Sequence, residues 1–262
     1  MDPRRTALIT GPTAGIGAAF ARALAASGHD VVLVARDGGR LTALADSLAT
    51  AHGVGTEVIV ADLSQPDGLA AVAARLADRD RPIDVLVNNA GFGVKSSFGR
   101  SDVEDEQRML TVLVTAVMRL THAAIPPMLE RGSGSVINVS SVAGWITGGT
   151  YSAAKAWVTV FSESLSAEFA GSGVRVTAAC PGFVHTEFHE RADMDMSSVP
   201  TWMWLEADAV ARQALGDSER GRALSVTGLQ YKAFSALLRH APRVIVRRVG
   251  AARSTSGRFA RR

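Results

Sequence analysis

The chain has 262 residues, of which 47% are hydrophobic and 20% are charged, and its formal net charge is +3. We expect one domain rather than several, because this length suits a single hydrophobic core and no proline- or serine-rich linker divides the sequence. The single cysteine, Cys180, excludes an internal disulfide and is expected to be a small buried residue rather than a nucleophile.

Neither a membrane span nor a secretion signal is expected. No uninterrupted apolar run approaches the roughly 20 residues that cross a bilayer. The first residues, MDPRRTALIT, pass into a strand-like segment without the apolar core of a signal peptide. We therefore expect a cytoplasmic protein, which agrees with the single cysteine.

Short β-branched runs alternate with longer segments of helical period along the chain. Strands are expected at TALIT (6–10), VVLVAR (31–36), TEVIVADL (56–63), IDVLVNNA (83–90), GSVINVSS (134–141), VRVTAAC (174–180) and, more weakly, RALSV (222–226). The intervening segments include a long helix near 103–124 and another from about 151 to 171. Strands joined by helices run parallel, so the pattern predicts an α/β fold with one doubly wound sheet of about seven strands and helices on both faces.

A glycine-rich turn, TGPTAGIG, follows the first strand and opens a helix. Gly11, Gly15 and Gly17 would let the backbone turn tightly and approach a ligand, and the exposed amides at the start of a helix attract a pyrophosphate. The position of this turn within a βαβ unit predicts a dinucleotide site.

The second strand ends in VVLVARD, where a doubly wound fold meets the adenosine ribose. The strand-end position is Ala35 and Arg36 follows it, which favours NADP(H) over NAD(H) because an arginine pairs with a 2′-phosphate. Asp37 would either repel that phosphate or cap the next helix, and we favour the cap.

Two further strand ends point to the same ligand. Asp62, after VIVA, is placed to meet the adenine edge. The run NNAG, Asn88 to Gly91, ends the fourth strand, where side-chain amides satisfy backbone groups and Gly91 leaves room for the adenosine half. For Asn88 we expect strand-end stabilisation alongside any role in cofactor binding.

The stretch GTYSAAKAWVTVF places Tyr151 and Lys155 four residues apart on an expected helix. Residues at this spacing lie on one face, so the pair is either a chemical site or an ordinary helix-surface pair. An ammonium that favours phenolate would bring a phenol, whose pKa is normally near ~10, into the range of proton exchange.

In this order and at these intervals, TGPTAGIG, NNAG, INVSS, YSAAK and PGFVHT resemble the short-chain dehydrogenase/reductase family over about residues 4–228. The resemblance implies a Rossmann-fold oxidoreductase that moves hydride between nicotinamide and a carbonyl or alcohol, usually as a homodimer or homotetramer. It also implies that Tyr151 is the acid/base, that Lys155 is its partner and that Ser141 orients the substrate, with Ser140 as the fallback serine. We do not expect both serines to face the site, because successive strand residues point to opposite sides. The residues that the resemblance places at the cofactor are Gly11, Thr13, Gly15, Ile16, Gly17, Arg36, Asp62, Leu63, Asn89, Ala90, Gly91, Tyr151, Lys155, Pro181, Gly182, Val184 and Thr186.

Two features depart from the family pattern. Leu113 stands where the family carries an asparagine that helps hold a water in a proton relay to the lysine. Because it belongs to an apolar stripe, we expect it to pack, with the relay rerouted through water and backbone or slowed. The interval from Ser141 to Tyr151 is also short, so the loop VAGWITGGT must be tight.

The variable region after PGFVHT, at about 186–206, is expected to form a lid over the substrate. Its large apolar side chains would suit a bulky apolar carbonyl compound, or would merely anchor the lid to the body. They are Phe188, Met194, Met196, Trp202, Met203, Trp204 and Leu205. His185 and His189 lack partners at ligand spacing, so no metal site is expected.

Residues 229–262 extend beyond the cofactor-binding domain expected at 1–228. Leu229, Phe234, Leu237, Leu238, Val244 and Val246 predict a helix or helix pair, interrupted at Pro242, with one apolar side. After Glu219 there is no acidic residue, while Arg220, Arg222, Lys232 and eight arginines from Arg239 onward make the end basic. We expect packing against the body or a second subunit and then a disordered tail. Peripheral membrane contact is a less favoured alternative, and nucleic acid is not an expected partner.

Taken together, the residues predict an NADP(H)-dependent carbonyl reductase or alcohol dehydrogenase for a poorly polar small-molecule substrate. The alternative is a regulatory or scaffold protein of the same fold that binds the cofactor but has lost turnover. Leu113 motivates that alternative, whereas Tyr151, Lys155 and a correctly placed serine favour the enzyme.

Overall fold

The computed structural model describes residues 4–187, 199–241 and 244. Among them, seven parallel strands form the main sheet, in the order β3-β2-β1-β4-β5-β6-β9. These strands are β1 (Thr6–Thr10), β2 (Asp30–Ala35), β3 (Thr56–Val60), β4 (Val85–Asn88), β5 (Gly134–Val139), β6 (Val174–Ala179) and β9 (Leu224–Ser225). A separate two-stranded ladder joins β7 (Phe183–Val184) to β8 (Trp204–Leu205), and the sequence pattern did not predict it.

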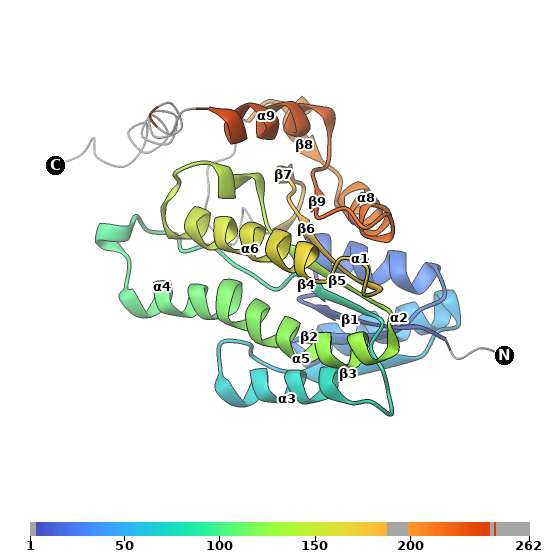
Figure 1. Ribbon diagram of the computed structural model, residues 1–262. Coiled ribbons are helices and arrows are strands. Elements are labelled where there is room, and N and C mark those ends of the chain that lie inside the picture. Colours follow the sequence, from blue (N-terminus) through green and yellow to red (C-terminus); the bar gives the residue numbers. More distant parts are fainter. Residues whose placement is uncertain (1–3, 188–198, 242–243, 245–262) are drawn as a thin grey trace.

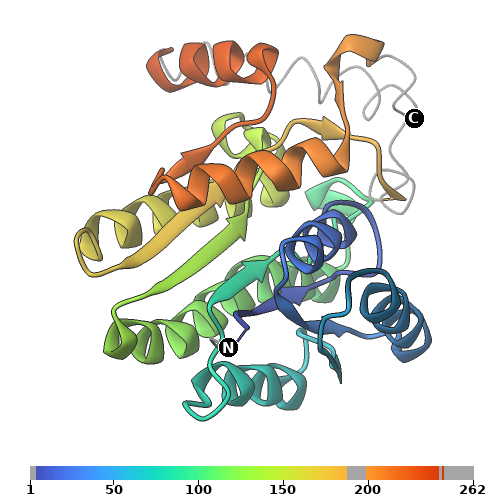
Figure 2. The ribbon, with the colours of Figure 1, turned by 90° about the vertical axis from the view of Figure 1, so that its right-hand side faces the viewer.

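Helices cover both faces of the sheet (Figure 1), which confirms the doubly wound α/β fold. In chain order they are α1 (Gly15–Ala26), α2 (Gly38–His52), α3 (Pro66–Ala77), α4 (Val103–Leu110), α5 (Ala116–Arg131), α6 (Gly149–Glu168), α8 (Ala207–Glu219) and α9 (Leu229–His240). Short 3-10 turns are η1 (Phe98–Arg100), η3 (Val142–Trp145) and η4 (Thr201–Met203), and η2 (Thr111–Thr115) is a π-helical segment. Helices α1, α2 and α8 pack on one face, and α3, α5 and α6 pack on the other (Figure 2).

The alternation of side chains along β1 creates the two cores. Ile9 is fully buried among residues of α1, α2 and α8, whereas its neighbour Leu8 is fully buried against α3 and α5. Successive strand residues face opposite sides, so an uninterrupted apolar strand is stable only when both faces are covered. This is why the central strands have no polar face.

The order of the strands places a ligand crevice. Strand β1 pairs with β2 on one side and with β4 on the other, so the direction of winding reverses between β1 and β4. In open parallel sheets the ligand binds outside the carboxyl ends of the strands at such a switch point. The turns that begin at Gly11 and Asn89 are therefore neighbours in space.

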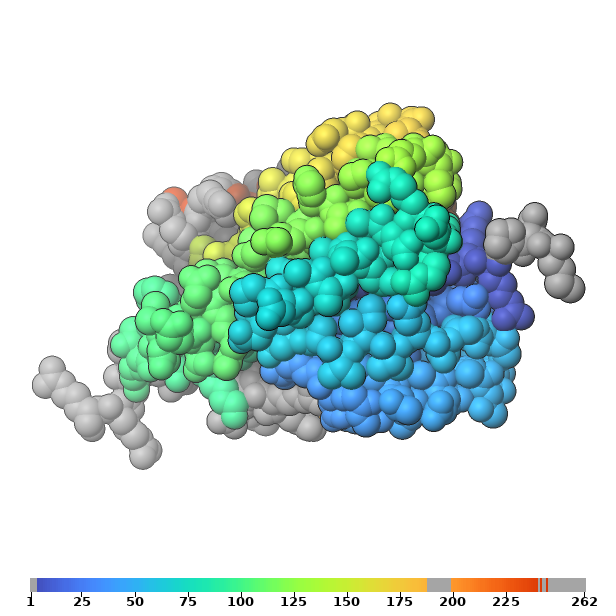
Figure 3. All heavy atoms as spheres, turned by 90° about the horizontal axis from the view of Figure 1, so that it is seen from below, coloured from blue at the N-terminus to red at the C-terminus, as the bar shows by residue number. Residues whose placement is uncertain are grey.

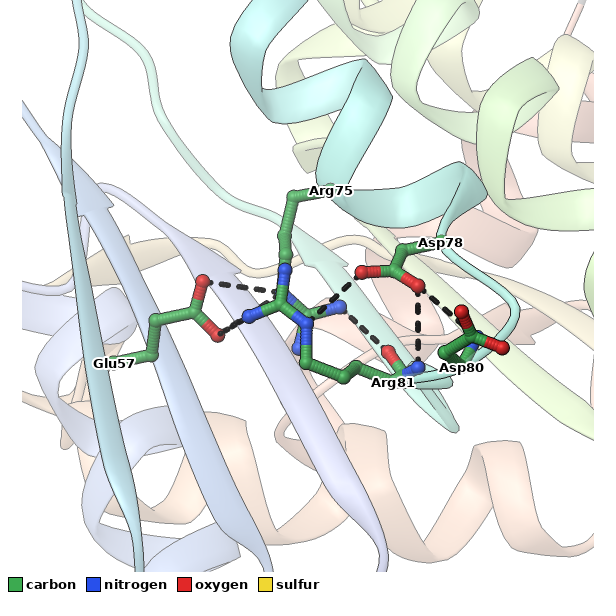
Figure 4. A network of polar contacts seen from close by, with 5 residues as sticks. All are labelled: Glu57, Arg75, Asp78, Asp80 and Arg81. Carbon is green, nitrogen blue, oxygen red and sulfur yellow. Dashed lines mark hydrogen bonds and ion pairs between the residues drawn. The ribbon is translucent and has the colours of Figure 1, made fainter.

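An ion-pair network secures the edge strand β3 at its other end (Figure 4). The buried Arg75 of α3 donates from Nε to the carboxylate of Glu57, at 2.9 Å, and from Nη1 to the carbonyl of Arg81, at 2.6 Å. Arg81 in turn donates to Asp78 at 2.9 Å. Figure 3 shows the face of the molecule on which α3 lies, seen from below the view of Figure 1. Because Glu57 lies at the beginning of β3, the network is remote from the crevice and serves the fold.

Two helices differ from their predicted ranges. The helix near 103–124 contains the π-helical segment and continues to Arg131, passing through Pro126 and Pro127. The tight packing of Pro127 and Met128 outweighs the hydrogen bonds that the prolines cannot donate. The helix expected at 151–171 begins instead at Gly149 and ends at Glu168.

The continuous helical stretch Val103–Arg131 is long and apolar enough, by composition, to cross a membrane. Half of its apolar window is buried inside the fold, and core helices of soluble proteins pass the same test. Within the described residues it is the only helix that meets the criterion.

Candidate active site

The glycine-rich turn has the shape of a phosphate cradle. Gly11 and Gly15 have φ angles of 66° and 53°, and a Cβ on Gly17 would lie 2.1 Å from the carbonyl oxygen of Gly11. Side chains are excluded there, and Ala14 at the start of α1 provides no side-chain cap. The first amides of α1 therefore have no side-chain acceptor on the N-cap residue, and the residues present fit a dinucleotide pyrophosphate.

The loop after β4 fixes that turn. The side-chain amide of Asn89 donates to the carbonyls of Thr10, at 2.9 Å, and Gly11, at 3.0 Å. The hydroxyl of Thr10 accepts from the backbone N–H groups of Asn89 and Ala90, both at 3.0 Å. Buried Asn88 instead donates to Thr121 at 3.1 Å and Asn138 at 2.9 Å, which is the expected strand-end stabilisation.

Basic side chains gather where the adenosine ribose would lie. Arg36 follows the end of β2 and is exposed, and Asp37 caps α2 by accepting from the backbone N–H of Arg40 at 3.0 Å. The predicted capping role of Asp37 is confirmed. The guanidinium of Arg40 also donates to the carbonyl of Thr13, at 2.8 Å, and to Glu187, at 3.2 Å. Arg40 thus joins the glycine-rich turn to the start of the lid region.

Asp62 lies within the electrostatic influence of Arg36 and Arg108. Partial burial opposes ionisation, but hydrogen bonds from Ser64 at 2.9 and 2.7 Å and the charges of Arg36 and Arg108 lower the pKa of Asp62 below its usual value. The carboxylate is therefore present at neutral pH. The side chain of the adjacent Leu63 is buried in the core, so only its backbone can contribute to the crevice.

The two serines after β5 point in opposite directions, as their adjacency predicts. Ser140 is buried, and its hydroxyl donates to the carbonyl of Lys155 and contacts Thr159, both at 2.7 Å. The hydroxyl of Ser141 is hydrogen-bonded with Tyr151 and accepts from the N–H of Ala143 at 3.1 Å. Only Ser141 shares the site with Tyr151, so the fallback through Ser140 is not needed.

Burial dominates the electrostatics of Tyr151 and Lys155. It raises the pKa of the Tyr151 phenol well above its usual value, although the hydrogen bond with Ser141 works in the opposite direction. It lowers the pKa of Lys155 from 10.5 to about 8. The Lys155 nitrogen lies 5.7 Å from the centre of the Tyr151 ring and donates to the carbonyl of Val139 at 2.7 Å. The expected lowering of the phenol pKa by the ammonium is not seen in this state.

The segment that begins at Pro181 lies between the loop at Ser141 and the glycine-rich turn. The carbonyl of Pro181 accepts from the N–H of Val142 at 3.0 Å, directly beside Ser141. At the other end of the segment, a Cβ on Gly15 would lie 2.7 Å from a side-chain carbon of Thr186. Residues 181–186 therefore bridge the space between Ser141 and the glycine-rich turn. Val184 is buried, so any ligand contact from it would come from the backbone.

Leu113 packs, as predicted. It is 1% exposed and clusters with Met109 and Ala154, against the partly buried Tyr151. The π-helical segment Thr111–Thr115 surrounds it, in place of the regular helix that the apolar stripe predicts. Such segments often mark functional sites. A polar relay partner is absent at this position, so the side chain at 113 contributes packing and no proton.

The described part of the lid region contacts the body through its aromatic residues. Trp204 stacks on His185 with ring centres 4.5 Å apart, and it lies 6.0 Å from Phe183. Trp202 is 66% exposed. No metal-binding group of three His, Cys, Asp or Glu side chains occurs in the described ranges. Phe188, His189, Met194 and Met196 lie outside the described residues.

Cys180 is fully buried, as predicted, and burial raises the pKa of its thiol to about 12. A thiol in this environment is not ionised at neutral pH and does not act as a nucleophile. The thiol lies 3.8 Å from the hydroxyl of Thr159, where it packs beneath the site.

The predicted site residues thus come together at the carboxyl edge of the sheet. The glycine-rich turn contacts Asn89 and Thr186, and Ser141 contacts Tyr151 and the segment from Pro181. Sequence reasoning missed Arg40, whose guanidinium touches the glycine-rich turn, and Tyr231 of α9, whose hydroxyl touches the segment from Pro181. The second arginine of the run RDGGRL, residues 36–41, was a sequence signal for a further cation at this site. Nothing local in the sequence signalled Tyr231.

The predicted apolar side of the C-terminal helix is also wrong in part. Leu229 and Leu237 are 82% and 69% exposed, whereas Tyr231, Ser235 and Leu238 are buried. The helix turns its tyrosine inward because the hydroxyl finds two backbone partners there. Pro242 and Val246 lie outside the described residues.

Comparison with known proteins agrees with this geometry. The family model for short chain dehydrogenases matches residues 5–197. Ketoacyl reductase HetN of Nostoc sp. is 34% identical over 183 residues, and this chain spans only 63% of that protein's length, with 69% of its own residues in the match.

Two solved structures cover almost the whole chain. A short-chain dehydrogenase from Sphingobium yanoikuyae in complex with NADPH is 34% identical, with 98% of each chain covered and a TM-score of 0.83. A bulky-bulky ketone specific alcohol dehydrogenase from Comamonas testosteroni is 30% identical, with 98% of this chain and 96% of that chain covered and a TM-score of 0.77. The chain described here therefore belongs to the short chain dehydrogenase family of nicotinamide-dependent oxidoreductases, which act on alcohol and carbonyl groups.

Proposed function

We propose that this protein is an NADP(H)-dependent oxidoreductase that transfers hydride between nicotinamide and a poorly polar carbonyl or alcohol. One observation carries the proposal. Tyr151 is hydrogen-bonded with Ser141 and has the Lys155 ammonium beside its ring, at the edge of the sheet that also holds the uncapped start of α1. An acid, an orienting hydroxyl and a phosphate cradle thus share one crevice.

In the direction of reduction, the bound nicotinamide would supply hydride to the carbonyl carbon. Ser141 orients the carbonyl oxygen beside the Tyr151 hydroxyl, and Tyr151 donates its proton to that oxygen as negative charge develops. Lys155 stabilises the tyrosinate that remains. Its pKa of about 8 keeps most of the ammonium protonated at neutral pH.

The preference for NADP(H) rests on the cations at the ribose end. The 2′-phosphate carries negative charge that Arg36 can neutralise, and Arg40 lies close by against the glycine-rich turn. The acidic Asp37 is occupied as a helix cap. The NADPH bound by the Sphingobium relative supports the same choice.

For the substrate we propose a bulky apolar ketone or the corresponding alcohol. Trp202, Met203 and Trp204 supply large apolar surfaces to the lid region, and Trp202 is mostly exposed. The Comamonas relative, named for bulky-bulky ketones, supports this class. We also propose a homodimer or homotetramer, as the family resemblance implies, and a cytoplasmic location, which agrees with the single cysteine.

The function is tested with a panel of aliphatic and aromatic ketones, aldehydes and alcohols, each assayed with NADPH or NADP⁺ and with NADH or NAD⁺. We expect NADPH with bulky ketones to give the highest kcat/KM. In Arg36→Ala, efficiency with NADPH should fall about 10- to 100-fold, the size of one charge-assisted hydrogen bond, with little change for NADH. Arg212→Ala, an exposed arginine on α8, is the matched control. A preference for NADH would contradict the cofactor assignment.

Leu113 favours one second candidate, a regulatory or scaffold protein that binds the cofactor without turnover. Its packed apolar side chain offers the proton relay no polar group. The same panel separates the two functions. Tight binding of NADPH with no reduction of any carbonyl would support the second candidate and contradict the first.

A further inference from the structure

We propose that Tyr231 is a positioning residue for the nicotinamide end of the site, so that the C-terminal helix α9 is part of the machinery of the reaction. The inference rests on the proposed function and concerns the same site. It assigns a role to a residue that lies outside the region matched by the family model, residues 5–197.

The hydroxyl of Tyr231 joins two segments that flank the crevice. It accepts a hydrogen bond from the backbone N–H of Phe183 at 2.9 Å and donates one to the carbonyl of Met203 at 2.8 Å. Phe183 belongs to the segment from Pro181 to Thr186, and Met203 ends η4 in the lid region. Tyr231 is only 2% exposed, so both bonds are sheltered from water and are costly to lose.

The ring of Tyr231 supports the same segment by close packing. A Cβ on Gly182 would lie 1.9 to 2.2 Å from three ring carbons of Tyr231. The backbone at Gly182 therefore rests directly on the ring. A shift of the ring, or a methyl group at Gly182, would displace the segment that lies beside Ser141.

Tyr231 packs in a cluster with residues from the three segments that surround the expected nicotinamide position. Its cluster contains Val184 and is flanked by Ile16 of the glycine-rich turn and Val142 of the loop that begins at Ser141. Arg36 and Asp62, at the adenosine end, follow strands β2 and β3, which lie on the other side of β1. A change at Tyr231 should therefore affect one half of the dinucleotide site and spare the other.

Polar contacts also hold α9 itself against this end of the body. Gln230 donates to the carbonyl of Trp202 at 3.3 Å, and Arg239 pairs with Glu163 at 3.2 Å. Glu163 lies on α6, the helix that carries Tyr151 and Lys155. Tyr231 is thus anchored from both sides and can transmit the position of α9 to the segment at Gly182.

The test uses Tyr231→Phe, which keeps the ring against Gly182 and removes only the hydroxyl. Dissociation constants are measured by calorimetry for NADPH and for 2′,5′-ADP, which contains only the adenosine end. We expect NADPH to bind about tenfold more weakly and kcat for ketone reduction to fall about 10- to 100-fold, because the nicotinamide is misplaced. Affinity for 2′,5′-ADP should stay within about twofold. If the wild type prefers NADH, NADH and ADP replace this pair.

Lys232→Gln, at the exposed neighbour on α9, is the matched control and should behave as the wild type in all three measurements. A second variant, Gly182→Ala, adds a methyl group that would collide with the Tyr231 ring and so displace the segment from Pro181 to Thr186. It should give the same split between NADPH and 2′,5′-ADP, which provides a second route if Tyr231→Phe does not fold.

Equal weakening of NADPH and 2′,5′-ADP would show a general loss of structure and would overturn the inference. So would unchanged NADPH affinity and kcat in Tyr231→Phe. These outcomes leave the proposed function intact, provided that the wild type binds and oxidises NADPH. A wild type that bound no nicotinamide dinucleotide would overturn the proposed function, and with it the inference.

Discussion

At the scale of single residues, we expect the burial of Lys155 to set how the site responds to pH. The side chain is buried beneath Tyr151 and donates to the carbonyl of Val139, which does not carry a full charge. Burial disfavours the ammonium, and none of the described carboxylates pairs with it, which explains the fall in the pKa of Lys155 to about 8. Titration of this lysine thus falls within the range in which an enzyme is assayed.

We therefore predict that kcat/KM for NADPH falls as the pH rises through about 8. The pKa of Lys155 in the folded protein is about 8, below its usual 10.5. Its amine is therefore almost fully protonated at pH ~6.5, half protonated at about pH 8 and largely deprotonated by pH ~9.5. The parameter kcat/KM reports the free enzyme, which is the state described here. The measurement is a pH profile of initial rates.

A matched variant makes the assignment specific. Lys155→Arg stays protonated over this whole range, so whatever activity it retains should show no inflection near pH ~8. A wild-type profile that stayed flat between about pH 6.5 and 9.5 would contradict the role of Lys155.

Helix geometry placed Tyr151 and Lys155 on one face but left a chemical pair and a surface pair both open, and the family resemblance selected the chemical pair. Sequence reasoning also separated Ser141 from Ser140 because adjacent strand residues alternate. It missed Tyr231 because the contacts of that residue with Phe183 and Met203 span 48 and 28 positions of the chain. No local periodicity encodes such a contact.

At the scale of elements, the last strand depends on one buried carboxylate. Strand β9 pairs with β6 through only two residues, Leu224 and Ser225. Asp217 on α8 is 2% exposed. Its carboxylate accepts hydrogen bonds from the hydroxyl of Ser225 and from the guanidinium groups of Arg220 and Arg222, each at 2.8 Å. Burial opposes its charge, but these donors and Gln213 lower the pKa of Asp217 below its usual value.

Replacing Asp217 with asparagine should therefore destabilise the fold. The expected loss in the free energy of unfolding at pH ~7 is about 1–3 kcal/mol, because the hydrogen bonds of three donors to a buried charged acceptor are weakened. A lowered carboxyl pKa stabilises the fold above its unfolded value of 3.8. The difference between wild type and variant should therefore shrink as the pH falls through and below that value.

Urea unfolding at pH ~7 and at pH ~3 measures both effects. The control is Asp208→Asn, in an exposed ion pair with Arg22, which should change the free energy of unfolding by less than about 0.5 kcal/mol. Equal stability of Asp217→Asn and the wild type at pH ~7 would show that β9 does not depend on this carboxylate.

Element boundaries were predicted less well than element types. The apolar stripe from Met109 to Leu120 correctly indicated a buried helix. All of its members are buried, namely Met109, Val112, Leu113, Ala116, Val117 and Leu120. The π-helical segment within it leaves the apolar pattern unchanged, so periodicity could not reveal it. The helix was expected to end near residue 124, but it continues through Pro126 and Pro127 to Arg131.

At the scale of the whole molecule, the arrangement of the sheet followed from the alternation of strands and helices. Right-handed crossovers leave few topologies for such a chain, and the motifs then fall at the carboxyl edge of the sheet. The β7–β8 ladder could not be predicted, because each of its strands has only two residues. Packing of α9 against the body was expected, but its contact through Tyr231 was not.

The central claim is that this crevice reduces a carbonyl with Tyr151 as the acid. The most direct test compares the wild type and Tyr151→Phe in NADPH oxidation with a bulky aryl ketone, together with NADPH affinity measured by calorimetry. We predict that the variant binds NADPH within about threefold of the wild type but has a kcat about 10²- to 10⁴-fold lower, the range that general acid catalysis supplies. A variant that turned over at close to the wild-type rate would contradict the account.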